Sequence, residues 1–204
     1  MNCSEECYAH ISANGKEKET LYAHTQLSQK YWIHIFRKKH IHVIVEKFEK
    51  EYLGPISDEA KILFEIMLVN IVTFHDFGKV NPIFQKKKME HEFHLELAPD
   101  NNIGSKHSIL SSVFYLDYFL GKINELEDKA ERELLKDFAY INSYIISRHH
   151  GKLVGLEQYL KSLSGRDTEG EDLGVRARAW LEKWKKEVMG EDKVSKFKIG
   201  RAHV

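Results

Sequence analysis

Residues Ile62–Phe74 (ILFEIMLVNIVTF) form the most apolar run in the chain, and His75-Asp76-Phe77-Gly78-Lys79 follows it directly. Because the run is apolar on nearly every helical face, it predicts a buried central helix. Polar and charged side chains at the end of such a helix are costly unless they are paired. His75 and Asp76 can contact one metal ion or two, since a carboxylate has two oxygens to share. A capped helix end with a solvated pair is the alternative. We expect Gly78 to permit the turn away from this point and Lys79 to return a positive charge close to it.

The composition is that of an ordinary globular protein, with 42% hydrophobic and 30% charged residues among 204. The chain has only 3 prolines and long periodic stretches, which predicts an all-α fold. Its length suffices for one domain with a sizeable core, or for a domain and a fragment of a second. Lys plus Arg and Asp plus Glu both number 31, so the net charge offers no general attraction to nucleic acid. Binding to nucleic acid would have to come from a local patch.

Cysteine usage and hydropathy indicate where the protein works. Cys3 and Cys7 are the only cysteines, too few for a disulfide scaffold in a domain of this size, which favours a reducing cytoplasm. The sequence has no N-terminal apolar leader and no apolar run of about 18 residues, so we expect no membrane span. It also has no Gly-x4-Gly-Lys-Ser/Thr loop, so no ATP-driven unwinding is expected from this chain.

The remaining pattern predicts further helices around the central one. Residues 1–18 predict an irregular N-terminal segment, and Glu19 to about Lys50 predicts one long helix or two, with Leu21, Leu27, Tyr31 and Ile35 as its apolar side. Ser57 is expected to cap the central helix. Later helices are predicted from a Ser105 cap to Gly121, over Glu125–His149, near Leu153–Leu163, and over Val175–Met189.

Histidines at helix faces or ends suggest a metal cluster. His24, His75-Asp76, His107 and His149-His150 are far apart in sequence, and buried metal sites in helical proteins draw ligands from several helices in this way. Five imidazoles and a bridging carboxylate would hold two divalent ions and leave positions open for water and substrate. So many nitrogen ligands favour Mn, Fe, Co, Ni or Zn over Mg alone.

His149 and His150 need a special local geometry to act together. They are predicted to end a helix, with Gly151 as a left-handed cap behind them. Consecutive helical residues point about 100° apart, so both rings reach one cavity only if the helix end is irregular or the ion lies off its tip. We expect both rings to approach His107 and Asp76.

The ordered motifs resemble those of the CRISPR-associated HD nuclease, a member of the HD phosphohydrolase superfamily and the nuclease part of the type I interference helicase–nuclease. The resemblance runs from about Glu19 to Gly151. His75-Asp76 is the superfamily signature, and the segments that make the resemblance specific are Glu19-Thr20-Leu21-Tyr22-Ala23-His24-Thr25, His75-Asp76-Phe77-Gly78-Lys79, Phe84-Gln85, Lys106-His107-Ser108 and Arg148-His149-His150-Gly151.

The resemblance implies an all-helical HD-domain bundle and metal-dependent cleavage of single-stranded DNA in CRISPR interference. His24, His75 and Asp76 would bind one ion, and Asp76 would bridge to a second ion held by His107, His149 and His150. Lys79 would steady phosphate charge. The ions would be Mn, Fe, Co or Ni, with Mg and Zn also open. The implied partners are single-stranded DNA, a CRISPR helicase in trans or on the same native chain, and the CRISPR RNA-guided surveillance complex.

One feature implied by the resemblance is missing. The family places a further aspartate on a later helix, in a stretch close to Ala-Asp-x-x-Ala-Ser, where it completes the first ion's ligands. No such stretch occurs here, and Asp167, Asp172 and Asp192 lie in polar or loop sequence. Residues 198–204 look like a translated sequencing-adapter read-through. We therefore expect an HD nuclease domain over 1–197 that is truncated at its C-terminus, and a non-native tail at 198–204.

Two other functions stay open on the same fold. The first is a nucleotide or cyclic-dinucleotide phosphohydrolase, which would use similar metal chemistry in a different pocket. The second is a degenerate HD module that binds metal or a partner without turnover, which the missing aspartate favours. Lys86–Lys88 and Arg37–Lys39 could guide a nucleic-acid backbone, although a cluster of this kind taken alone is more often a solvated run of charge.

Overall fold

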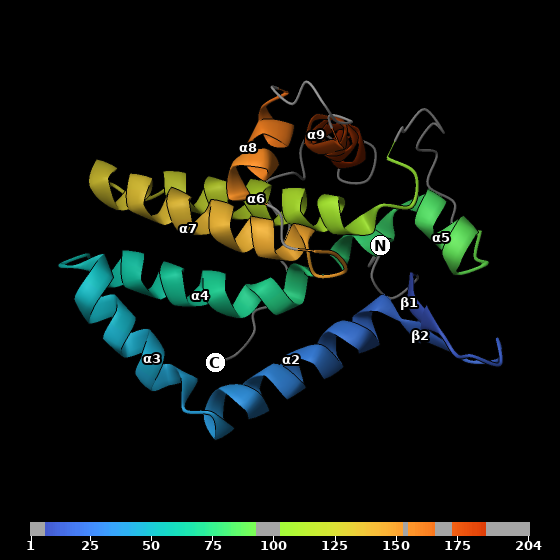
Figure 1. The fold of residues 1–204 in the computed structure, drawn as a ribbon, viewed down its shortest axis with the longest axis horizontal. Helices are drawn as coiled ribbons and strands as arrows, with labels where there is room; N and C mark the ends of the chain where they lie inside the picture. Colours follow the sequence, from blue (N-terminus) through green and yellow to red (C-terminus); the bar gives the residue numbers. More distant parts are fainter. Residues whose placement is uncertain (1–6, 93–102, 153–154, 166–172, 187–204) are drawn as a thin grey trace.

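The computed structural model describes residues 7–92, 103–152, 155–165 and 173–186, and these form an all-α fold, as the sequence predicts (Figure 1). The expectations for Cys3, Leu153, Met189, Asp167, Asp172, Asp192 and the 198–204 tail lie outside these residues. In chain order the elements are β1 (Tyr8–Ile11), β2 (Lys18–Thr20), α2 (Leu21–Lys38), α3 (Ile41–Phe48), the π-helical turn η1 (Glu49–Leu53), α4 (Asp58–Phe74), the 3-10 turn η2 (Phe77–Val80), α5 (Pro82–Lys88), α6 (His107–Asn124), α7 (Lys129–Ser147), α8 (Leu156–Ser164) and α9 (Leu173–Trp184).

A short antiparallel hairpin precedes the helices, where the sequence predicted an irregular segment. β1 pairs with β2 in a register that places His10 opposite Glu19 and Tyr8 opposite Thr20. Strands of four and three residues are too short to show a clear period-two alternation. The hairpin leads directly into α2, because Thr20 is also the residue whose side chain caps that helix by accepting from Ala23 N.

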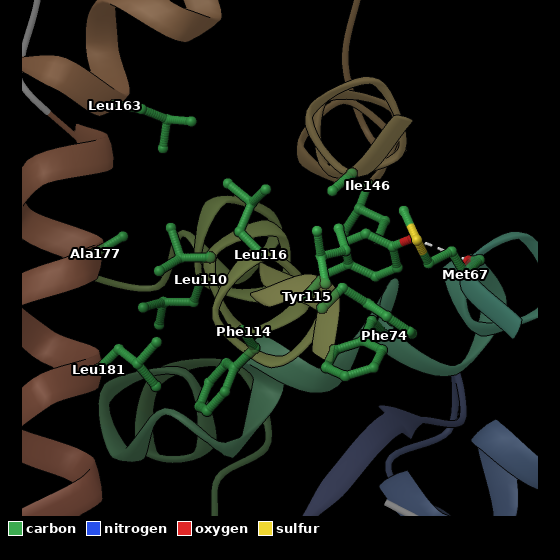
Figure 2. Packing of buried hydrophobic residues seen from close by; sticks show 14 of the residues in the cluster. Met67, Phe74, Leu110, Phe114, Tyr115, Leu116, Ile146, Leu163, Ala177 and Leu181 are labelled. Carbon is green, nitrogen blue, oxygen red and sulfur yellow. Dashed lines mark hydrogen bonds between the residues drawn. The ribbon is translucent and has the colours of Figure 1, made fainter. Parts of the chain in front are cut away.

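The helix at the centre of the core is α6, which contacts α4, α7, α9 and η2. Figure 2 shows its Phe114 on the side of α9 and its Tyr115 on the side of α4. The Tyr115 hydroxyl donates to the Met67 carbonyl at 2.9 Å and accepts from the Asn142 side chain at 2.9 Å. These bonds join α4, α6 and α7 through one buried phenol.

The apolar run that follows Ser57 forms helix α4 as predicted, but the prediction of burial on nearly every face is wrong. Ser57 caps the helix by accepting from Ala60 N. Phe64, Met67 and Phe74 face the core, whereas Ile62 is 56% exposed. The helix packs on one side against α6 and α7. Uniform apolarity could not reveal this, because no polar face in the sequence marks the outward side.

The predicted helix over Glu19–Lys50 is two helices, α2 and α3, separated at His40, whose φ of 52° is left-handed. Its predicted apolar side is buried only at Leu21, and Tyr31 is 61% exposed. Helix α2 therefore packs chiefly at its first turns and projects away from β1 and β2 (Figure 1). His24, which the sequence predicts to be a metal ligand, lies in the packed part.

Several predicted helix ends are wrong by a few residues. Lys106, not Ser105, is the N-cap of α6, and α6 continues through Gly121 because Ile123 beyond it is buried. Helix α7 begins after Asp128, whose side chain accepts from Glu131 N, and ends at Ser147. Gly151 does not adopt the left-handed conformation predicted for it.

Candidate metal centre

The 3-10 turn η2 carries the end of α4 against the start of α6. Gly78 N donates to Ser111 Oγ at 2.8 Å, and a Cβ at Gly78 would lie only 2.1 Å from the His107 carbonyl oxygen. The chain turns here as predicted, in η2. Gly78 has no positive φ, so the structural need for a glycine is the close approach of two elements. That approach brings Asp76 next to His107.

Asp76 lies at the centre of the cluster, and each of its carboxylate oxygens faces a different group of side chains. Oδ1 lies 3.3 Å from His107 Nε2, 3.2 Å from His149 Nε2 and 3.9 Å from His150 Nε2. We call this group the Oδ1 side. Oδ2 lies 3.1 Å from His24 Nε2, 3.4 Å from His75 Nε2 and 2.8 Å from Lys79 Nζ, and we call this group the Oδ2 side. The structure thus brings together every site residue that the sequence indicated.

His149 and His150 converge because the helix has ended before them. Helix α7 stops at Ser147, and Arg148 has left helical geometry, with φ −113° and ψ 7°. The two rings are 4.0 Å apart between centroids, and both face Asp76 Oδ1. The expected irregular helix end is confirmed, without the left-handed glycine.

Three rings are held so that Nε2 points at the carboxylate. Nδ1 of His75 donates to the Val72 carbonyl at 2.7 Å, Nδ1 of His149 donates to the Ile146 carbonyl at 2.6 Å, and Nδ1 of His24 lies 3.2 Å from Glu19 Oε2. These oxygens only accept, so Nδ1 carries the proton and Nε2 of a neutral ring offers a lone pair. Such lone pairs would face carboxylate oxygens, which also only accept. A cation, either a proton or a metal ion, has to lie between them.

Protons alone cannot easily fill the positions between the Nε2 atoms and the Asp76 carboxylate, because protonating several rings would gather several positive charges around one negative charge. Burial would raise the pKa of Asp76, but contacts with His107, His149, His24 and His75 hold it well below its usual range, so the carboxylate stays charged. That single negative charge already pairs with buried Lys79. Burial lowers the pKa of His107. Its buried Nε2 lies 3.3 Å from Asp76 Oδ1 but makes no hydrogen bond of good geometry within the described residues. A metal ion would satisfy that nitrogen without adding a charged ring.

The spacing of the ligand atoms fits metal ions. Ligands on neighbouring positions of an ion with bonds of about 2.0–2.2 Å lie about 2.9–3.6 Å apart. The contacts of His24, His75, His107 and His149 with Asp76 fall at 3.1–3.4 Å, and Nε2 of His24 lies 3.3 Å from Nε2 of His75. Imidazoles around one carboxylate suit transition metals better than Mg.

Lys79 lies beside the cluster as predicted, but its ammonium is turned inward. Its side chain is 3% exposed, and Nζ contacts Asp76 Oδ2 and donates to the Ala9 carbonyl at 3.0 Å. Lys79 therefore holds Asp76 and β1 in place. Its action on phosphate charge stays a prediction.

The structure adds one group that sequence reasoning missed, His10, and gives a role to Gln85, which the sequence indicated only as part of a motif. His10 on β1 lies beside His24, with ring centroids 4.7 Å apart. The buried Gln85 side chain bonds both N and O of Tyr8 and also the Lys79 carbonyl, which ties β1 to η2. The sequence signal for His10 was a lone histidine in a segment predicted to be irregular. Only the pairing of His10 with Glu19, a neighbour of His24 in the fold, reveals its position.

The two basic clusters lie at different distances from the site. Lys86–Lys88 form the exposed last turn of α5, and Phe84 of the same helix contacts the His107 ring at 4.8 Å between centroids. Arg37–Lys39 end α2, about 20 Å from His24 at 1.5 Å per helical residue. Only the first cluster adjoins the candidate metal centre.

Comparison of the chain with protein-family models, curated proteins and solved structures finds no match. The resemblance to the HD nuclease therefore depends on the motif residues themselves and on the cluster they form. In the part of the chain that the structure describes, no helix is both long and apolar enough to cross a membrane.

Proposed function

We propose that this protein is a metal-dependent HD nuclease that hydrolyses phosphodiester bonds of single-stranded DNA through a two-ion site. One observation carries the proposal: the buried carboxylate of Asp76 directs one oxygen to each of two separate groups of imidazole Nε2 atoms. His107, His149 and His150 would hold one ion, and His24 and His75 the other, with Asp76 between them.

When bound, two such ions supply Lewis acidity that lowers the pKa of a water molecule and offsets charge on the phosphate oxygens. The protein's own residues fix the geometry for this chemistry. Val72, Ile146 and Glu19 orient three rings through Nδ1. Lys79 restrains Asp76 from the buried side, so the carboxylate cannot turn away from either group.

The surroundings support a polymeric substrate. Lys86–Lys88 lie on the helix whose Phe84 contacts His107, and three ammonium groups there could attract a phosphate backbone beyond the scissile bond. The motif resemblance points to single-stranded DNA, to a CRISPR helicase that unwinds it, to the CRISPR RNA-guided surveillance complex, and to the cytoplasm. These partners and the compartment are part of the proposal.

The test uses the full chain, stripped of metal with a chelator and reloaded separately with Mn, Co, Ni, Zn or Mg. Substrates are linear and circular single-stranded DNA, duplex DNA, single-stranded RNA, mononucleotides and cyclic dinucleotides. We expect cleavage of single-stranded DNA only in the reloaded protein and none in Asp76→Asn. Turnover of nucleotides alone would indicate a phosphohydrolase, and metal binding without any turnover a degenerate module. Either result would overturn the nuclease proposal.

A further inference from the structure

The two sides of Asp76 do not offer the same number of predicted ligands. The Oδ1 side has three imidazoles, whereas the Oδ2 side has two, His24 and His75, and also a lysine that cannot bind metal while charged. A further protein ligand there would equalise the two sides.

His10 is in position to be that ligand. One ligand atom each from His10, His24 and Asp76 lie within 4.8 Å of one another. Two ligands on opposite positions of an ion with bonds of about 2.0–2.2 Å are about 4.0–4.4 Å apart. The His10 side chain is exposed, so a change of its side-chain torsion angles can bring a ring nitrogen to such a spacing.

Hydrogen bonds fix the backbone of the two residues that precede His10, so the fold holds this part of β1 in place. The Ala9 carbonyl accepts from buried Lys79, and Gln85 bonds both backbone atoms of Tyr8. On the neighbouring strand, Glu19 lies opposite His10 and also contacts His24 Nδ1. The same hairpin therefore positions His10 and orients His24.

We propose that His10 is a ligand of the Oδ2-side ion, so that His10, His24, His75 and Asp76 hold it together; this inference rests on the proposed metal-dependent function. Such a shell contains three imidazoles and a single shared carboxylate. Nitrogen-rich sites favour Co, Ni and Zn over Mn and Mg. We therefore expect the Oδ2 side to prefer Co, Ni or Zn.

The experiment compares metal content and chelator competition in the full chain, independently of cleavage. His149→Ala removes a ligand from the Oδ1 side, and His24→Ala removes one from the Oδ2 side. We expect His10→Ala to lower affinity for the remaining ion of His149→Ala at least about tenfold, by analogy with the loss on removing even an outer partner of a metal ligand. In the His24→Ala background, His10→Ala should change nothing further. His34→Ala, an exposed histidine of α2, is the matched control.

Cobalt absorption gives a second readout, because removing a nitrogen ligand changes the visible spectrum of the bound ion. His10→Gln keeps a polar side chain on β1 and should show the same weakening. Unchanged affinity and an unchanged spectrum in both His10 variants would overturn the proposal. Loss of both ions in both variants would also overturn it, since a ligand of one ion should spare the other. If the wild type binds two ions without cleaving DNA, the nuclease proposal fails while the His10 assignment holds.

Discussion

The Oδ1 and Oδ2 sides of Asp76 present similar donor atoms but rest on different supports. The Oδ1 side comes from the start of α6 and the end of α7, which are joined in the core by the Ser143 hydroxyl donating to the Ser112 carbonyl at 3.1 Å. The Oδ2 side combines His75, at the end of α4, with the hairpin and the first turn of α2, a helix with much of its apolar side exposed. In the hairpin, hydrogen bonds from Lys79 and Gln85 add to the packing of Ala9 and Leu21 in the core.

This difference predicts that one carboxylate would hold two ions with unequal affinity. The helices that carry His107 and His149 are fixed in the core, although the His150 ring is 56% exposed, and no charged lysine contacts Oδ1 among the described residues. Oδ2 already bears an ammonium at 2.8 Å, and like charges close together repel. We therefore expect a tight ion on the Oδ1 side and a weak ion on the Oδ2 side.

The largest effect should come from removing what the two sides share. Asp76→Asn keeps the shape but loses the charge, so both ions and all metal-dependent cleavage should be lost. Buried Lys79 loses its partner, which should lower the free energy of unfolding of the metal-free protein by about 3–5 kcal/mol. Elemental analysis and denaturant titration measure the two effects.

The control for Asp76→Asn is the double variant with Lys79→Met. Removing the unpaired ammonium should restore part of the stability while metal content stays at background. Wild-type metal content in Asp76→Asn would contradict the bridging role and with it the comparison of the two sides.

The next largest effect should be the loss of one ion at a time, caused by removing a ligand from only one side. His149→Ala should abolish the tight step of a metal titration, and His24→Ala should abolish the weak step. Since outer partners of metal ligands are worth about 10–100-fold in affinity, removal of a ligand should cost at least about 100-fold. Isothermal titration with Co or Mn resolves the steps. If either variant loses both steps, the two sides share a single ion.

Sequence reasoning located the cluster well because its signals are local. His75-Asp76 follows an apolar helix, and His149-His150 follows another, so the chemistry was marked by residue type and spacing. The contacts that hold the cluster in place were harder to predict from the sequence. The role of Gly78 depends on α6 lying against it, and the place of His10 depends on strand pairing with Glu19. Both are long-range contacts that no window of sequence contains.

The fold shows the same division. The helices around Phe64 and Tyr115 were predicted, since apolar periodicity reports them, but the identity of the central helix was not. Ile62–Phe74 is more apolar than it is buried, whereas α6 is the helix surrounded by α4, α7 and α9. Hydropathy measures how apolar a helix is. Which helix lies at the centre of the core depends on how many other helices pack against it, and hydropathy does not report that.

A smaller effect should follow from loosening only the Oδ2 support. Gln85 is fully buried and bonds Tyr8 on both backbone atoms, so Gln85→Ala leaves backbone groups unpaired at a cost of about 1–3 kcal/mol. The weak ion should lose about tenfold in affinity, equivalent to about 1.4 kcal/mol, and the tight ion should be unaffected. Gln26→Ala, on the exposed face of α2, is the matched control. Equal weakening of both steps would show that the hairpin supports both sides.

The smallest effect is a difference in how acid releases the two ions. Contact with Asp76 raises the pKa of His24 on the Oδ2 side, whereas burial lowers the pKa of His107 and of His150 on the Oδ1 side. Burial and Lys79 also lower the pKa of His10, but one protonated ligand is enough to weaken a site. An imidazole binds metal only when its nitrogen is unprotonated.

The sign follows from these directions. A ring with a raised pKa is already protonated at a pH where an ordinary histidine is still neutral, so protons compete with the weak ion above the reference value of about 6.5. On the Oδ1 side, the lowered pKa values of His107 and His150 keep these two rings neutral to lower pH, so the tight ion should be retained. Metal titrations between about pH 8 and about pH 5.5 should therefore lose the weak step first. In His24→Ala the remaining step should keep the acid resistance of the tight ion. Release of both ions at one pH in the wild type would mean that the two sides titrate as a unit. The different supports of the two sides would then have no effect on how strongly each ion resists acid.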